Sequence, residues 1–113
     1  MNCEISFSGS FLQEMKRLHK KYRSIDSDLA KLLARLRLNP KEGVDLGRGL
    51  RKVRLPISSK GRGKSGGVRV ITHTVIIVQI NACVTLLAIY DKSEKQNMND
   101  AELRELLKKN ELL

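Results

Sequence analysis

Positively charged side chains recur at strand spacing in the middle of the sequence. Lys52 and Arg54 alternate with apolar residues, so in a strand both point to the face opposite the apolar one. Arg69 interrupts a β-branched apolar run, and because burying its charge is costly, we expect it on an open face, directed at an anion. If the two strands pair, these three cations share one face, and Lys92 completes the set from the end of the last strand. Such a cluster requires an anionic ligand, which a phosphate backbone supplies.

A second basic cluster lies in the glycine-rich segment 58–67. Lys60, Arg62 and Lys64 alternate there with glycines, an arrangement that bends around a backbone and offers N–H groups to phosphate oxygens. The Gly-Lys-Ser run at 63–65 lacks the earlier glycine of a nucleotide-binding P-loop. The segment therefore favours a basic loop that orders on RNA over a nucleoside-triphosphate site.

The charge balance also points to a polyanion. The 113 residues contain 22 Lys and Arg against 12 Asp and Glu, a net charge of +10. A small basic domain attracts nucleic acid first and anionic membranes second, although a merely solubilising surface is the plain alternative. The length predicts one domain over 1–113, and only 4% aromatic residues predict an aliphatic core. Two cysteines in apolar strand contexts predict free thiols and a reducing cytoplasm.

The first third of the chain predicts one strand and two helices. Residues 3–7 alternate between apolar and polar, as in a half-buried strand. Apolar residues then recur at helical spacing over 11–22 and again over 25–36. Asn39-Pro40 ends the second helix, because the residue before a proline is pushed out of the helical region. Two helices joined by so short a connection are expected to pack as a hairpin.

Serines are the expected caps of both helices. Ser10 precedes the first apolar repeat and Ser24 precedes the second. The outer face of the first helix is basic and includes Lys20 and Lys21. We expect these two side chains to be solvated or to contact RNA.

The remainder of the chain predicts three strands joined by turns. A loop is expected over 41–49, followed by a half-buried strand over 53–57. Residues 68–80 are strongly β-branched and 84–90 are almost continuously apolar, so both strands should be central in the sheet. A tight turn at 81–82 would join them as an antiparallel hairpin.

The last element is predicted to be a helix that begins at Asn99 or Asp100. Its inward residues are Leu103, Leu106 and Leu107. The predicted fold is therefore α+β with the order β-α-α-β-β-β-α. The helical hairpin must cover one face of the sheet to bury its apolar stripe, which leaves the other face partly open.

Several segments resemble the RelE/HigB family of the RelE/ParE superfamily, the toxins of bacterial type II toxin–antitoxin systems. They are Leu-His-Lys-Lys-Tyr at 18–22, Asn-Pro at 39–40, Gly-Leu-Arg-Lys-Val-Arg at 49–54, Gly-Gly-Val-Arg-Val at 66–70 and Leu-Ala-Ile-Tyr-Asp-Lys at 87–92. The resemblance covers nearly the whole chain and is most specific at the last three strands. It implies a RelE-like fold and a ribosome-dependent endonuclease that cuts mRNA, with a protein antitoxin as inhibitor.

The resemblance also implies site residues. Arg69 stands where the family has its main catalytic arginine, and Lys52 and Arg54 resemble its basic strand pair. Lys92 lies near the second basic cluster of the family, but Ser93 replaces the second arginine.

The general base has no clear match in this sequence. Met98 lies near the position of the aromatic base in RelE, and Tyr90 is an imperfect substitute for it. His73 and Glu94 are further candidates.

The implied reaction is attack of a ribose 2′-hydroxyl on the neighbouring phosphate, without metal or cofactor. Arg69 suits charge stabilisation because it stays protonated and presents a fixed fork to phosphate. Lys52 is a hypothetical base, if crowding by Arg54 and Arg69 makes its ammonium group easier to deprotonate.

The implied partners are the cognate antitoxin, in a hetero-oligomeric complex, and the 70S ribosome with mRNA; no membrane is expected. Two other functions stay open. One is a ParE-like inhibitor of DNA gyrase on the same scaffold, and the other is a non-catalytic nucleic-acid-binding module.

Overall fold

The computed structural model describes residues 2–60, 67–77 and 81–113. Its elements are β1 (Asn2–Phe7), α1 (Gly9–Lys21), α2 (Ile25–Leu38), β2 (Val44–Gly47), β3 (Leu50–Leu55), the 3-10 turn η1 (Ser58–Lys60), β4 (Val68–Ile77), β5 (Asn81–Asp91) and α3 (Asp100–Lys109). Among the described residues, no helix is long and apolar enough to cross a membrane.

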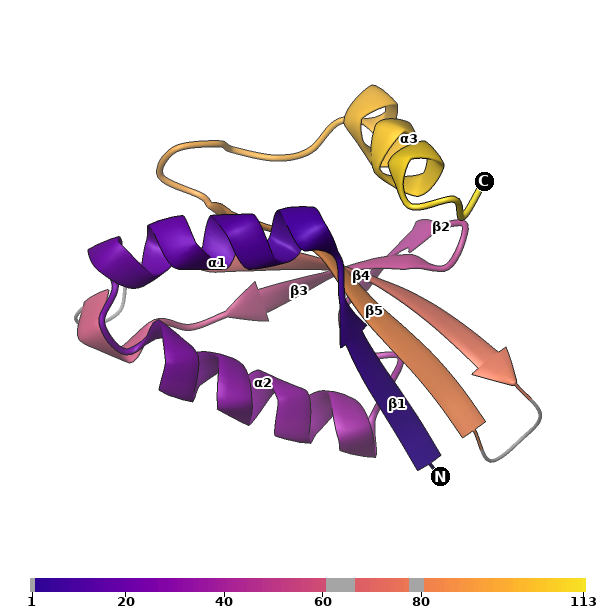
Figure 1. Ribbon diagram of the computed structural model, residues 1–113, viewed down its shortest axis with the longest axis horizontal. Coiled ribbons are helices and arrows are strands. Elements are labelled where there is room, and N and C mark those ends of the chain that lie inside the picture. The colour runs from indigo at the N-terminus through magenta and orange to yellow at the C-terminus, as the bar shows by residue number, and fades with distance from the viewer. Residues whose placement is uncertain (1, 61–66, 78–80) are drawn as a thin grey trace.

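The strands form one five-stranded sheet in the order β1-β5-β4-β3-β2 (Figure 1). β1 runs parallel to β5, and the other neighbours are antiparallel. β4 and β5 occupy the middle of the sheet, as their apolar sequences predict. The α+β fold, with an N-terminal strand, a helical hairpin, an antiparallel meander and a C-terminal helix, is confirmed.

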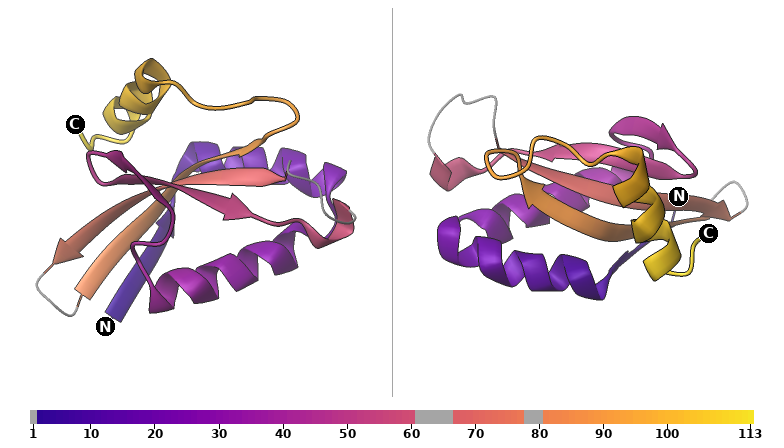
Figure 2. Two further views of the ribbon diagram at one scale, coloured as in Figure 1. Left: turned by 180° about the vertical axis from the view of Figure 1, so that it is seen from behind. Right: turned by 90° about the horizontal axis from the view of Figure 1, so that it is seen from above.

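The hairpin of α1 and α2 covers one face of the sheet (Figure 2). The helices and strands bury a largely aliphatic core there, in agreement with the composition. Its fully or almost fully buried side chains include Phe11, Leu18, Ile25, Leu32, Leu36, Val53, Leu55, Val68, Val70, Val84 and Leu86. Val53 and Leu55 therefore occupy the predicted inward positions of their strand.

The helix caps differ in detail from the prediction. The Ser8 hydroxyl accepts a hydrogen bond from the Phe11 backbone N–H at 3.1 Å, whereas Ser10 already lies in the first turn of α1. Ser8 is preferred because the strand ends there and its hydroxyl also donates to the Leu87 carbonyl at 2.8 Å. Ser24 precedes α2 as predicted, but its hydroxyl makes no cap bond.

α3 covers part of the opposite face of the sheet (Figures 1 and 2). Asn99 caps it in a reciprocal capping box with Glu102, which confirms the predicted start of the helix. Its predicted inward leucines form a second apolar cluster with the sheet, made of Leu50, Ile71, Leu87, Tyr90, Leu103, Leu106 and Leu107. Helices thus lie on both faces, and the face opposite the hairpin is only partly open because α3 covers a part of it.

The expected loop over 41–49 contains a strand. Val44–Gly47 form β2, which pairs with β3 in antiparallel register. The chain turns between the two strands through Gly47, Arg48 and Gly49, whose φ angles are +87°, +55° and +80°. Glycine supplies two of these three left-handed positions without a steric cost. The short, largely exposed β2 gave no apolar alternation that sequence analysis could recognise.

The predicted turn at 81–82 is wrong. Asn81 and Ala82 lie inside β5 and stand opposite Ile77 and Ile76 of β4. The hairpin therefore connects the two strands through residues before Asn81, which lie outside the described residues.

Asp91 fastens the end of β5 to the end of α1. Its side chain is fully buried and accepts hydrogen bonds from the Tyr22 hydroxyl at 2.5 Å and from the Lys21 ammonium at 2.7 Å. The backbone N–H and the hydroxyl of Ser93 donate to its other oxygen, at 2.9 and 2.8 Å. Burial alone would raise the pKa of Asp91, but these hydrogen bonds outweigh burial and hold it well below its usual range.

We predict that Asp91→Asn lowers the free energy of unfolding by about 2 kcal/mol at pH 7, because a buried charge-assisted network is lost. Urea unfolding followed by circular dichroism measures this. A depressed folded-state pKa stabilises the fold above the unfolded pKa of about 3.9 and loses that effect as the pH falls toward the folded value. The difference between wild type and variant should therefore shrink below about pH 4.

Glu94→Gln is the matched control, since Glu94 contacts the same Lys21 from an exposed position. Its effect should stay below about 1 kcal/mol. Equal losses in the two variants would show that Asp91 does not anchor the strand.

Candidate functional site

Lys52, Arg54 and Arg69 lie on the same face of the sheet, the one that α3 partly covers. Arg54 stands directly opposite Arg69 in the β3–β4 register, and Arg69 stands directly opposite Tyr90 in the β4–β5 register. Lys52 shares the Arg54 face because side chains alternate along a strand. Arg54 is exposed, while Lys52 and Arg69 are half-buried. The structure thus brings together the three cations that strand spacing predicted.

The three cations line a shallow depression with a volume of about 470 Å³. It also takes in the edge of the sheet where β2 begins, and its lining is Arg35, Glu42, Gly43, Val44, Lys52, Val53, Arg54, Pro56 and Arg69. Gly43 has a φ of +107°, and a side chain there would meet the Lys52 carbonyl oxygen at 2.6 Å. Close packing of this segment against β3 therefore requires glycine.

Tyr90 and Lys52 both meet Asn97, which sequence analysis did not single out. The Lys52 ammonium donates to the Asn97 Oδ1 at 3.3 Å, and the Tyr90 hydroxyl lies 3.5 Å from the same oxygen. Tyr90 is only 6% exposed because α3 packs over its ring. Burial raises the pKa of the Tyr90 hydroxyl, and the nearby charge of Arg69 opposes this only in part. The phenol therefore stays protonated at neutral pH and is suited to donate a proton.

Lys92 lies at the Arg69 end of the sheet. Its backbone N–H donates to the Gly67 carbonyl at 3.0 Å, which places it across from the residue that precedes β4. Gly67 itself has a φ of +80°, and a Cβ there would lie 3.9 Å from the Arg69 Nη1. The start of β4 therefore holds Arg69 and the backbone of Lys92 at one end of the sheet.

Of the glycine-rich segment 58–67 and its basic cluster, the structure describes mainly the first residues. Lys60 ends η1, and Arg62 and Lys64 lie outside the described residues, as does the Lys60 side chain. η1 is fastened to the start of α2, because the Ser58 backbone N–H and hydroxyl donate to the buried Asp28 at 3.0 and 2.7 Å. The segment that carries the cluster is therefore anchored, at η1, to the start of α2.

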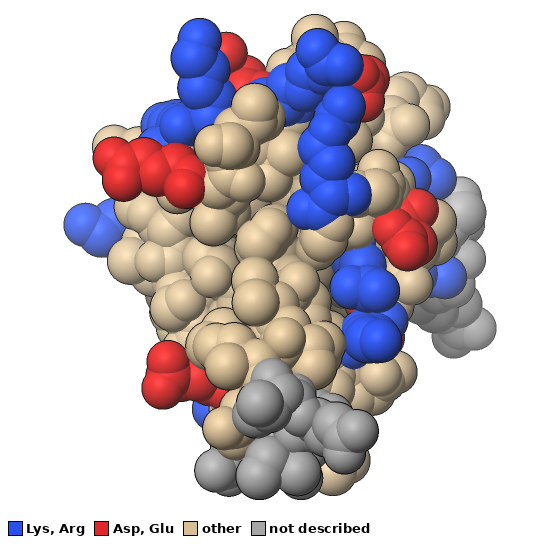
Figure 3. Space-filling view, turned by 90° about the vertical axis from the view of Figure 1, so that its right-hand side faces the viewer, with Lys and Arg blue, Asp and Glu red and all other residues tan. Residues whose placement is uncertain are grey.

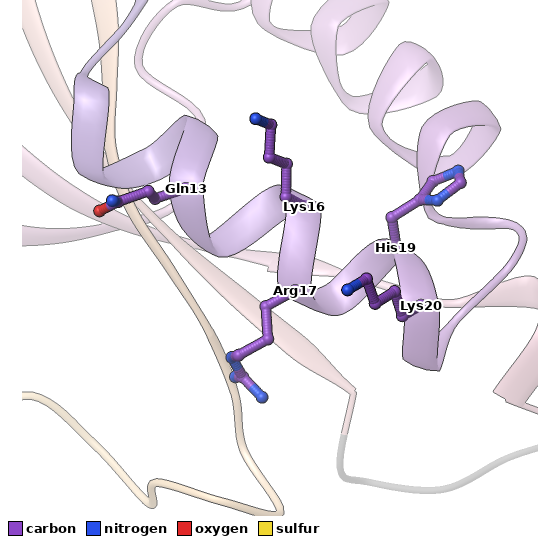
Figure 4. A pocket seen from close by; sticks show the side chains of 5 residues that line it. All are labelled: Gln13, Lys16, Arg17, His19 and Lys20. Carbon is purple, nitrogen blue, oxygen red and sulfur yellow. The ribbon is translucent and has the colours of Figure 1, made fainter.

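Lys20 and Lys21 have different surroundings. Lys21 is engaged by Asp91 and by Glu94, as described above. Lys20 is exposed and lines a shallow surface depression along the outer side of α1, together with Gln13, Lys16, Arg17 and His19 (Figure 4). This basic area belongs to the hairpin layer, and α3 and the Arg69 cluster lie on the other face of the sheet. Lys20 is thus the better candidate of the two for an external contact.

His73 and Glu94, the further candidates for a base, do not line the depression of Arg69. His73 stands four residues along β4, roughly 13 Å away at strand spacing. Burial lowers the pKa of His73, so its imidazole is neutral at physiological pH. Hydrogen bonds from Arg17 and then from Lys21 hold the pKa of Glu94 below its usual range, which makes this carboxylate a weak base.

The arrangement suits a polyanionic ligand. Four positive side chains and one carboxylate line the depression among the described residues. Three of the cations are arginines, which present planar forks suited to phosphate oxygens, and two of these, Arg54 and Arg69, stand opposite each other. Cations also gather along one flank and the upper part of the side view in Figure 3, while the centre of that side carries no charged side chain. On this side, the positive charge therefore lies toward the margins.

Comparison with known protein families matches residues 11–112 to the family described as the RelE toxin of RelE/RelB toxin–antitoxin systems. The fold is also similar to a solved structure of a mutant of the E. coli toxin RelE in the free state. The TM-score is 0.62 at 17% sequence identity, with 96% of this chain and 98% of that chain covered. At this identity, the structural likeness shows the fold alone.

The electrostatic effect of Arg69 on Tyr90, its partner in the strand register, can be tested by titration, since the chain has two tyrosines and no tryptophan. In a Tyr22→Phe background, the ultraviolet absorbance of phenolate reports Tyr90 alone. We expect a midpoint above the usual value of about 10, and a further upward shift when Arg69→Ala removes the opposing positive charge. Arg104→Ala, on exposed α3 surface, should leave the midpoint unchanged. An unshifted midpoint in the Arg69 variant would show that the two groups are not neighbours.

Proposed function

The chain belongs to the RelE toxin family, and we propose that it is an mRNA endonuclease that acts on the ribosome. The observation that carries this proposal is the convergence of Lys52, Arg54 and Arg69 on one face of the sheet. Like charges at neighbouring positions repel each other, and the phosphates of an RNA backbone would offset that repulsion. A toxin that acts by blocking a protein partner would not require this set of cations.

In the proposed reaction, the 2′-oxygen of a ribose forms a bond to the adjacent phosphorus as the bond to the 5′-oxygen of the next nucleotide breaks. The products are a 2′,3′-cyclic phosphate and a 5′-hydroxyl. Negative charge develops on the non-bridging oxygens of the five-coordinate intermediate. Arg69, with Arg54 opposite it, stabilises that charge through its guanidinium.

Two proton transfers complete the reaction. Lys52 is proposed to release a proton to water and then, as the neutral amine, to take the 2′-proton; the Asn97 Oδ1 fixes the position of its nitrogen. Tyr90, protonated because burial raises its pKa, is proposed to donate a proton to the leaving 5′-oxygen. Lys92 adds positive charge at the same end of the sheet.

The proposed partners follow from the family. A cognate antitoxin would neutralise the toxin in a hetero-oligomeric complex, and the substrate would be mRNA on the 70S ribosome in the cytoplasm. Lys60, Arg62 and Lys64 are proposed to contact RNA from the glycine-rich segment, and Lys20 from α1. Lys21 is proposed to act mainly by holding Asp91. The net charge of +10 would draw the protein to ribosomal RNA.

We expect Arg69→Ala to lower mRNA cleavage by about 100- to 1,000-fold, the usual effect of removing one donor that stabilises transition-state charge. Arg69→Lys should restore only a part, because it keeps the charge and loses the fork. Mapping of mRNA 5′ ends in a translating extract measures this.

Arg104→Ala is the control, because it removes an exposed arginine of α3 and should cleave like wild type. Cuts should lie only in ribosome-covered codons. Intact mRNA together with blocked DNA supercoiling would contradict the proposal and favour a gyrase inhibitor. Unaltered RNA binding without any cleavage would favour a non-catalytic binding module.

A further inference from the structure

The depression beside Arg69 extends over the edge of the sheet to a residue of the opposite layer. β2 pairs with β3 only as far as Lys52, so the outer edge of β3 beyond that residue is not covered by β2. Arg35 of α2 reaches this edge, where its Nη2 donates to the Arg54 carbonyl at 3.3 Å. Although α2 packs on the other face of the sheet, its Arg35 thus adds a positive charge beside Lys52, Arg54 and Arg69.

The guanidinium of Arg35 is held in a fixed position by Glu42. Its Nε lies 3.2 and 3.0 Å from the two oxygens of this carboxylate, and its Nη2 lies 2.9 Å from Oε2. The side chains are nevertheless 41% and 27% exposed. Within the described residues, the Arg35 Nη1 donates no hydrogen bond. The group is therefore oriented in advance and still open to an additional oxygen ligand.

The size and charge of the depression exceed what one phosphate needs. Its volume of about 470 Å³ is lined by four cations and, among the described residues, by the single carboxylate of Glu42. Phosphates repeat along an RNA strand, so a strand whose scissile phosphate lies at Arg69 must place a neighbouring phosphate nearby. The open edge beside Arg54 gives the strand a path out of the site toward Arg35.

We propose that Arg35 forms a second phosphate-binding subsite for the RNA strand, and that Glu42 orients it and limits its affinity. The inference rests on the proposed RNA substrate and assigns a flanking phosphodiester to this edge of the sheet. Glu42 has two opposing effects, because it holds the guanidinium in place while adding a negative charge that repels phosphate. A subsite of this kind holds the strand during cleavage and lets the product leave.

The two residues of the pair allow a test in which binding and purely structural roles give opposite results. If Arg35 binds phosphate, Arg35→Ala weakens RNA binding and Glu42→Gln strengthens it or leaves it unchanged. If the Arg35–Glu42 ion pair only stabilises the segment between α2 and β2, both variants remove the same ion pair and both weaken RNA binding. Arg37→Ala is the matched control, since it removes an exposed arginine of the same helix that does not line the depression.

The probe is a ten-nucleotide RNA with every 2′-hydroxyl methylated, which cannot be cleaved, and binding is followed by fluorescence anisotropy across a range of salt concentrations. Arg35→Ala should weaken binding by about tenfold at low salt and reduce the salt slope by about 0.7, the value for one phosphate contact to a single strand. Arg35→Lys should keep most of the slope. Unfolding curves for each variant exclude loss of the fold as the cause.

Three results would overturn the inference: no binding of the probe by wild type, an Arg35→Ala variant that binds like wild type, or equal weakening in Glu42→Gln. The outcome is separable from that of the proposed function, because the probe reports binding without cleavage. If Arg35→Ala weakens binding but ribosomal mRNA stays intact, the subsite stands and the nuclease proposal fails. If mRNA is cut but Arg35→Ala binds like wild type, only the subsite is lost.

Discussion

Two arginines stand directly opposite each other on neighbouring strands, and the organisation of the site depends on that pairing. Arg54 and Arg69 are fixed in register because Val53, Leu55 and Val70 must all face the hairpin core. A slip of one residue would turn the apolar side chains outward and the arginines inward. Like charges at directly opposed positions destabilise a sheet. Core packing therefore holds two positive charges opposite each other, an arrangement suited to an anionic ligand.

The other elements hold this arrangement from three sides. The hairpin of α1 and α2 supplies the apolar layer that fixes the register of β3, β4 and β5. Asp91 ties the end of β5 to α1 and so sets the position of the neighbouring Tyr90. α3 covers Tyr90, and the segment before it carries Asn97, which meets both Tyr90 and Lys52. The cations are thus placed by strand geometry, while the groups suited to proton transfer are placed by packing.

This division explains how much the sequence alone could predict. The faces of Lys52, Arg54 and Arg69 follow from alternation along a strand, and the hairpin follows from helical spacing, so both are local properties. The parallel pairing of β1 with β5 and the position of α3 on the other face depend on contacts between distant segments. Asn97 and the Arg35–Glu42 pair were missed for the same reason. Nothing in the sequence around these residues indicates which side chains they contact in the fold. β2 was missed because it is short, exposed and rich in turn residues.

The central claim is that the face bearing Arg54 and Arg69 binds a phosphodiester. The most direct measurement is a titration of isotope-labelled protein with a 2′-O-methyl RNA trinucleotide, followed through the Nε–H resonances of the arginines in nuclear magnetic resonance spectra. Arg54 and Arg69 are expected to show the largest saturable shifts, while the resonances of Arg17 on α1 and Arg104 on α3 are expected to stay in place. Largest shifts at Arg17, with Arg54 and Arg69 unchanged, would place the RNA on the hairpin face and contradict the account.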